Sequence, residues 1–169
     1  MAFHFAWVDA GQTVFSSAFA REDEQVLSFE LAQEEGDFAS LRLEVRNPRV
    51  GLLSINRKRW GWLSASEGST VTPLFLGRLI GLPEEMNEEV VTLSFIAKPL
   101  NYQAAKAAVA DTMRQAQYFD PLFIEQERRL EPDTVLEARP MVWHIDRVTH
   151  AMTASHVLTG EDGTLAFGD

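Results

Sequence analysis

VTPLFLGRLIGLPEEMNEEVVTLSFIAKP, residues 71–99, is the stretch of the chain that decides the fold. It holds two apolar runs rich in β-forming residues, Leu74–Leu79 and Val90–Ala97, with the acidic segment Pro83–Glu89 between them. Apolar runs of this length, bounded by turn-forming residues, are typical of strands. No catalytic or cofactor motif stands beside these runs, so this stretch indicates a protein that works as part of an assembly.

The residues before this stretch alternate with the period of strands. Apolar side chains occupy every second position in residues 27–31 and again in 41–45. This is the pattern of a strand with one buried face. Because the turn-forming segment Glu34–Asp37 separates the two runs, we expect them to form an antiparallel pair.

A further strand is expected at residues 58–65, where Trp60 and Trp62 fall on one face. With the two runs of 71–99 this makes five strands joined by Gly, Pro and acidic turns. Five short strands at this spacing favour an antiparallel β-barrel or β-sandwich. We expect residues 71–99 to close that structure as a hairpin.

The periodicity changes after residue 99. Apolar residues then recur every three or four positions over residues 102–116. This predicts one amphipathic helix, with Asn101 as its N-cap. Asp120 followed by Pro121 predicts the start of a short second helix that ends in the charged run Glu125–Glu131.

The predicted fold class is therefore α+β, mainly β. We expect a β-barrel domain at residues 1–99, a helical segment at 100–131 and a β-hairpin region at 132–169. The last region contains two predicted strands, at 141–148 and 152–158. We interpret it as the start of a second domain that the chain truncates.

Composition excludes several classes of function. The chain has 169 residues and a net charge of -10, which argues against a nucleic-acid-binding surface because phosphate contacts need clustered Lys and Arg. It has no Cys, which excludes disulfides, thiolate metal sites and Cys nucleophiles. No apolar run approaches the roughly 18 residues that a membrane span needs, so no membrane partner is expected.

Two groups of polar residues could carry chemistry, and each has a simpler interpretation. His144 and Asp146 share one face of a predicted strand and could hold a metal, but no third ligand stands at a fixed spacing. The acidic clusters Glu22–Glu24, Glu34–Asp37 and Glu84–Glu89 could supply a glycosidase-type acid pair. We interpret the first pair as a polar strand face and the clusters as solvated turns. The sequence thus predicts no catalytic residue, no metal site and no cofactor, and therefore not an enzyme.

The one basic cluster, Arg57-Lys58-Arg59-Trp60-Gly61-Trp62, is interleaved with aromatic residues. Arg and Trp side chains can stack on bases or sugars. A turn followed by core Trp residues is the simpler interpretation, and a protein–protein contact is the next, since Trp and Arg are enriched at binding hot spots. The candidate interaction residues are Arg57, Arg59, Trp60, Trp62, Phe75 and Arg78.

Four β-patterned segments follow one another in a particular order: Val26–Glu30, Ala39–Pro48, Arg59–Leu63 and Leu74–Leu79. This order resembles the opening domain of the tail-tip and baseplate hub proteins of bacteriophages, prophages and related contractile or gene-transfer particles. Leu136–Thr149 is similar to the segment that leads into the next hub domain in such proteins.

The resemblance implies a barrel related to the tail-tube subunit, assembled into a ring that is often trimeric and that joins the tube to the tip. The implied partners are further copies of the chain and neighbouring tail proteins, with DNA only passing through a channel. The implied location is the virion tail, and the host cytoplasm during assembly. A complete hub protein is longer than 169 residues, so the chain is expected to be its N-terminal part. The alternative is a glycan-binding or hydrolytic tail-tip module that acts on the bacterial envelope.

Overall fold

The computed structural model describes residues 1–34, 36–46, 59–81, 89–115, 124–137 and 139–156. The chain forms two compact units. The first comprises Met1–Glu34, Phe38–Lys98 and Asp146–His150, and the second comprises Glu35–Asp37, Pro99–Ile145 and Ala151–Asp169. The division into regions 1–99, 100–131 and 132–169 stays a prediction.

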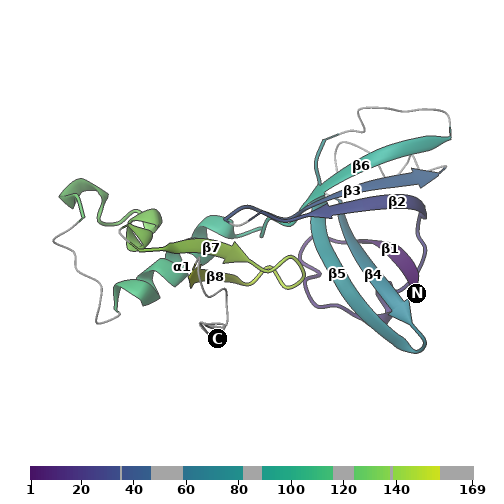
Figure 1. Ribbon diagram of the computed structural model, residues 1–169, viewed down its shortest axis with the longest axis horizontal. Coiled ribbons are helices and arrows are strands. Elements are labelled where there is room, and N and C mark those ends of the chain that lie inside the picture. The colour runs from purple at the N-terminus through teal and green to yellow at the C-terminus, as the bar shows by residue number, and fades with distance from the viewer. Residues whose placement is uncertain (35, 47–58, 82–88, 116–123, 138, 157–169) are drawn as a thin grey trace, which may run out of the picture. The chain divides into compact units, whose positions relative to one another are not determined.

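The first unit is built on one six-stranded antiparallel sheet (Figure 1). Its strands, in chain order, are β1 (Ala2–Val8), β2 (Gln25–Ala32), β3 (Ser40–Arg46), β4 (Trp60–Glu67), β5 (Thr70–Leu79) and β6 (Val90–Ile96). Their order across the sheet is β1-β4-β5-β6-β3-β2, so β1 and β2 are the edge strands. A single 3-10 turn, η1 (Ser17–Phe19), lies in the long connection between β1 and β2.

The predicted pairing of the runs at 27–31 and 41–45 is confirmed. β2 and β3 are antiparallel neighbours, with Phe29 opposite Leu43. The register shifts between Val26 and Ser28, which leaves Leu27 as an extra residue in a β-bulge. Along β3, buried residues alternate with more exposed ones, as the period of two requires.

The predicted hairpin of residues 71–99 is present as an antiparallel pair, but it is short and lies in the middle of the sheet instead of closing it. β5 and β6 are neighbours, but only Arg78 and Leu79 of β5 have register partners on β6. β5 pairs with β4 along almost its whole length, and β6 pairs residue by residue with β3. The two strands therefore separate over most of their length, and 71–99 spans the middle of the sheet.

One face of the sheet carries the main hydrophobic core, to which all six strands contribute. Each large apolar side chain that is fully buried contributes about 1.5–3 kcal/mol, so this face is the main source of stability for the unit. Its fully buried members are Phe5, Ala39, Leu41, Leu43, Val45, Leu63, Phe75, Val91, Leu93, Phe95 and Ala97, with Trp7 almost as deep.

The opposite face of β1, β4 and β5 carries a second, smaller cluster, made of Val8, Trp60, Trp62 and Leu76. Phe15, Phe19 and Val148 pack over it. Because side chains cover both faces of β4, its first six residues are all buried and show no alternation of exposure.

The second unit contains the helix and a two-stranded sheet. Its elements are α1 (Tyr102–Arg114), the 3-10 turns η4 (Gln126–Arg128) and η5 (Pro132–Leu136), β7 (Met141–Ile145) and β8 (Met152–His156). The predicted amphipathic helix and the two late strands are confirmed, but the first of these strands ends at Ile145. Residues 146–148 lie outside it, so Asp146 does not share a strand face with His144 as predicted.

Two details of the helical predictions differ from the structure. Asn101 stands at the N-cap of α1, but its side chain makes no capping hydrogen bond. Asp120 and Pro121 lie outside the described residues, and the part of the predicted second helix that is described, from 124 to 131, holds only the 3-10 turn η4. Among the described helices, none is long and apolar enough to cross a membrane.

Candidate functional site

The predicted interaction residues do not form one exposed patch. Trp60 and Trp62 are 2% and 0% exposed, and Phe75 is fully buried on the other face of the sheet. Arg59 and Arg78 are half-buried, and Arg57 lies outside the described residues. The burial of both Trp residues agrees with their interpretation as core residues.

The chain itself covers the two Trp side chains. The Trp62 indole stacks on the ring of Phe19, meets Phe15 edge to face, and donates a hydrogen bond from Nε1 to the carbonyl of Gln12 at 3.1 Å. The connection between β1 and β2 therefore occupies the surface that a stacked base or sugar would need.

Edge strands β1 and β2 offer the more accessible surface. Within the described residues, each has one ladder neighbour and one edge without a ladder partner. Phe3 and Leu27 are 39% and 42% exposed. β2 contains neither Pro nor Lys, two residues that natural sheets use to block strand addition at an edge.

The two edges also approach one another. The backbone amide of Asp23 donates to the carbonyl of Phe5 at 2.9 Å, and the rings of Phe3 and Phe29 meet edge to face with centroids 4.8 Å apart. β1 thus contacts β2 through the rings of Phe3 and Phe29, and it contacts the residue two positions before β2 through one backbone hydrogen bond.

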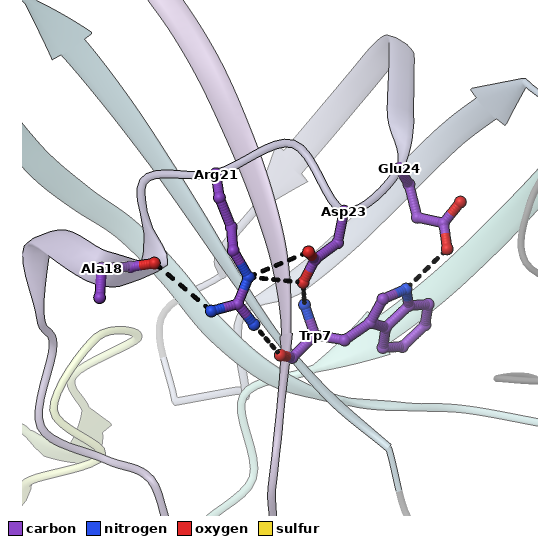
Figure 2. A network of polar contacts seen from close by, with 5 residues as sticks. All are labelled: Trp7, Ala18, Arg21, Asp23 and Glu24. Carbon is purple, nitrogen blue, oxygen red and sulfur yellow. Dashed lines mark hydrogen bonds and ion pairs between the residues drawn. The ribbon is translucent and has the colours of Figure 1, made fainter.

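A polar network fixes the chain just before β2 against β1 (Figure 2). Arg21 forms an ion pair with Asp23 at 2.9 Å and donates to the carbonyl of Trp7. Asp23 accepts a hydrogen bond from the Trp7 amide at 2.9 Å, and Glu24 accepts one from the Trp7 indole at 2.8 Å. These contacts hold the start of β2 beside the end of β1.

Two carboxylates that the sequence assigned to a solvated turn therefore have structural partners. Asp23 is paired with Arg21, and Glu24 is only 4% exposed. The alternation of Phe3, Phe5 and Trp7 is the signal that sequence reasoning missed, since it predicts strand β1 and with it an aromatic neighbour for these acids.

His4 and Ser66 make a contact that the sequence did not suggest. His4 Nε2 lies 2.8 Å from Ser66 Oγ, the distance expected between a nucleophile and its base. Among the described residues, His4 Nδ1 has no hydrogen-bond partner, so no acid orients the imidazole. The contact is best explained as a cross-strand polar pair between β1 and β4.

The candidate metal pair does not gather ligands. Asp146 Oδ1 accepts hydrogen bonds from the amides of Val148 and Thr149 and from the Thr149 hydroxyl. Its role is to organise a turn. The described residues contain no group of three or more His, Asp or Glu side chains that could hold a metal ion.

In the second unit, Lys106 of α1 is the centre of a further cluster. Its Nζ lies 2.5 Å from Asp133 Oδ1 and 5.2 Å from the ring centroid of Trp143, whose indole donates to the same Asp133 oxygen at 2.6 Å. Burial acts to raise the pKa of Asp133, but hydrogen bonds from Lys106 and Trp143 outweigh it and the pKa is lowered. The cluster joins α1, η5 and β7.

Comparison with known proteins identifies no relative, because no protein-family model and no curated protein matches the chain.

Proposed function

We propose that the chain is a structural subunit of a phage-like tail, a baseplate hub or tail-tip component that assembles into a ring between the tail tube and the tip. The observation that carries the proposal is the pair of accessible edge strands on a sheet with a complete core. Exposed strand edges are natural joining sites, and repeated head-to-tail contacts that close produce rings.

We further propose that the six-stranded sheet is a barrel, as in tail-tube subunits, that stays open between β1 and β2, so both strands keep an edge without a ladder partner among the described residues. The contacts between β1 and β2, through Phe3 with Phe29 and through Asp23 with Phe5, support this form over a sandwich. The shared inner core supports it as well, because apolar side chains from all six strands pack into one cluster.

Of the two edge strands, β2 is the better site for binding a neighbouring protomer. Leu27 sits in the bulge without a register partner on β3 and is 42% exposed. A strand that adds to β2 beyond the bulge, along residues 28–32, gains backbone hydrogen bonds, and its side chains can cover Leu27. The chain would then act by self-association and by contact with neighbouring tail proteins.

The alternative, a glycan-binding or hydrolytic module of the tail tip, would be favoured by a pocket lined by Trp60 or Trp62 and a lone carboxylate. Both Trp side chains are buried under Phe15, Phe19 and Val148. No observation on the described residues favours this alternative, so the structural role remains our proposal.

The test is to measure the mass of the protein in solution over a wide range of concentration and to examine the particles for rings by electron microscopy. We expect concentration-dependent assembly into a closed oligomer. A protein that stays monomeric at every concentration would contradict the proposal.

A variant pair locates the contact. Leu27→Lys places a charge on the β2 edge at a position without a register partner, so the fold should be kept and assembly lost. Val14→Lys makes the same change at a site that is 83% exposed and outside any strand, and it should assemble as the original protein does. Equal assembly by both variants would exclude the β2 edge as the contact.

A further inference from the structure

Part of strand β5 has an edge that no strand covers within the described residues. β6 pairs with β5 only at Arg78 and Leu79, so Leu76 has β4 on one side and no strand on the other. Leu74 is the extra residue at a register shift and has no register partner on β4 or β6. In a strand, the N–H and C=O of one residue point to the same edge, and residues two apart share that edge. The amide and carbonyl of Leu76 and the carbonyl of Leu74 face this open edge, as their hydrogen bonds show.

Residues 146–150, which follow β7 in the chain, occupy this edge. The amide of Leu76 donates to the carbonyl of Arg147 at 2.9 Å, and Arg147 Nε donates to the carbonyl of Leu74 at 3.0 Å. The carbonyl of Leu76 accepts a hydrogen bond from His150 Nε2 at 2.7 Å. We name residues 146–150 the strap, because their side chains and backbone form hydrogen bonds with three backbone groups of β5.

Asp146, the first residue of the strap, fixes the conformation of the strap through hydrogen bonds. Asp146 Oδ1 accepts from the amides of Val148 and Thr149 at 2.9 and 2.6 Å, and the carbonyl of Asp146 accepts from the amide of His150 at 2.9 Å. Val148 then packs against the cluster of Trp60, Trp62 and Leu76.

His150 has an uncommon backbone conformation and a buried side chain. It has a φ of 59°, in the left-handed region that a residue with a side chain rarely adopts, and it is only 8% exposed. Because a carbonyl can only accept, His150 Nε2 carries the proton in the bond to Leu76. In the neutral ring, Nδ1 is therefore unprotonated. A second proton on Nδ1 would place a positive charge in a buried position.

The surroundings of the imidazole oppose that charge. Burial lowers the pKa of His150, while the hydrogen bond to Leu76 and the charge of Asp146 act in the opposite direction without restoring the ordinary value. Among the described residues of the strap, Asp146 supplies the charge that acts on the ring. β4 contributes the uncharged indole of Trp60, at a centroid distance of 5.4 Å, and β5 contributes the Leu76 carbonyl.

We propose that the strap is a pH-responsive cover, which lies on the β5 edge while His150 is neutral and leaves that edge when the imidazole is protonated. Release removes the positive charge from a buried site and lets residue 150 leave its left-handed conformation. It also frees the Leu74 and Leu76 backbone groups to pair with another strand. The proposal does not depend on a role in a phage tail.

Hydrogen exchange of the Leu76 amide tests this directly, because that amide bonds to the strap. We expect protection near neutral pH and, after correction for the intrinsic rate, a loss of up to about tenfold for each pH unit as the pH falls from about 6.5, the ordinary pKa of a released imidazole, toward the lower pKa of the covered His150 ring. The Leu79 amide bonds to the Arg59 carbonyl instead and serves as an internal reference. Equal loss at Leu76 and Leu79 would mean general unfolding and would overturn the proposal.

Two variants test whether the pH dependence of Leu76 protection comes from the His150 imidazole. His150→Asn tolerates the left-handed conformation and keeps a donor but does not titrate, so Leu76 protection should no longer depend on pH. His4→Gln removes another imidazole of the same unit and should leave the pH dependence unchanged.

In the original protein, the ring signal of His150 should titrate with the same midpoint as Leu76 protection. This measurement does not rely on any variant folding. Protection of Leu76 that does not change with pH, different midpoints, or a pH dependence that persists in His150→Asn would overturn the proposal.

Discussion

Gly61 and Gly77 face one another across β4 and β5, and both are required by the aromatic core. A Cβ on Gly61 would lie 2.5 Å from two atoms of the Phe5 ring, and one on Gly77 would lie 2.5 Å from Cζ of Phe75. Real side chains do not approach so closely, and the rings are buried and cannot move away. These positions accept only glycine because two rings fill the volume that a methyl group would need.

We therefore expect Gly61→Ala to destabilise the first unit by about 1–3 kcal/mol, the usual range for overpacking a core. Urea unfolding of the variant and the original protein measures this difference. In a Phe5→Leu background the same glycine change should cost less, since the ring that it meets is gone. A Gly61→Ala protein as stable as the original would show that the core has more room at this point than the structure gives.

At the scale of elements, helix α1 depends on contacts with its neighbours. Ala110 is its one fully buried residue, and Asn101 does not cap it with its side chain. Helices of 13 residues are marginal alone, so packing must hold them. The Lys106–Asp133–Trp143 cluster supplies part of that packing by joining α1 to η5 and β7.

The lowered pKa of Asp133 determines the direction of the pH effect. The ionised carboxylate stabilises the folded unit above the unfolded pKa of about 4, and this contribution is lost as the pH falls through the lower folded value. We expect Asp133→Asn to reduce stability near neutral pH and to make the acid part of the stability curve flatter. The effect should be modest, because the Asp133 side chain is 60% exposed.

Urea unfolding followed by helical circular dichroism over a pH series measures this effect. Asp111→Asn is the matched control, since Asp111 pairs with Arg114 on the exposed surface of the same helix and should change little. If both variants lose the same stability, the cluster has no special role.

At the scale of the whole molecule, the net charge of -10 acts on any self-association. Like-charged protomers repel, and salt reduces the range of that repulsion from about 30 Å at 0.01 M to about 8 Å at physiological ionic strength. The proposed contact at the β2 edge consists of backbone hydrogen bonds and the apolar side chain of Leu27, which salt does not weaken in this way.

We therefore expect self-association to become stronger as sodium chloride is raised from low to physiological concentration. Sedimentation velocity at several salt concentrations measures this change. Dissociation by salt would instead indicate a contact between opposite charges, and would contradict an apolar edge contact.

The predictable part of the fold follows from local periodicity. The alternation at 27–31 and 41–45, the three- and four-residue period of 102–116 and the late strands all became the expected elements. Strand β1 was predictable too, because Phe3, Phe5 and Trp7 alternate with smaller or polar residues. These patterns predict the elements correctly because each depends only on which face of a single helix or strand is buried.

The candidate interaction residues were not predictable in the same way. Trp60 and Trp62 share a strand face, but whether that face meets solvent depends on Phe15, Phe19 and Val148, which are distant in sequence. Burial of Glu24 against Trp7 depends likewise on β1 lying beside the start of β2. No local sequence pattern shows that residues distant in the chain will bury a side chain.

The sequence by itself determined a mainly β chain with one amphipathic helix, because the spacing of apolar residues follows directly from strand and helix geometry. Only the tertiary structure decided that β5 and β6 separate after two register pairs and that the edge beside Leu74 and Leu76 is covered by residues 146–150. The physical reason is that a ladder partner is chosen by competition among all strands and loops that can reach an edge. That competition satisfied the backbone groups of β5 with β4 and the strap, and those of β6 with β3.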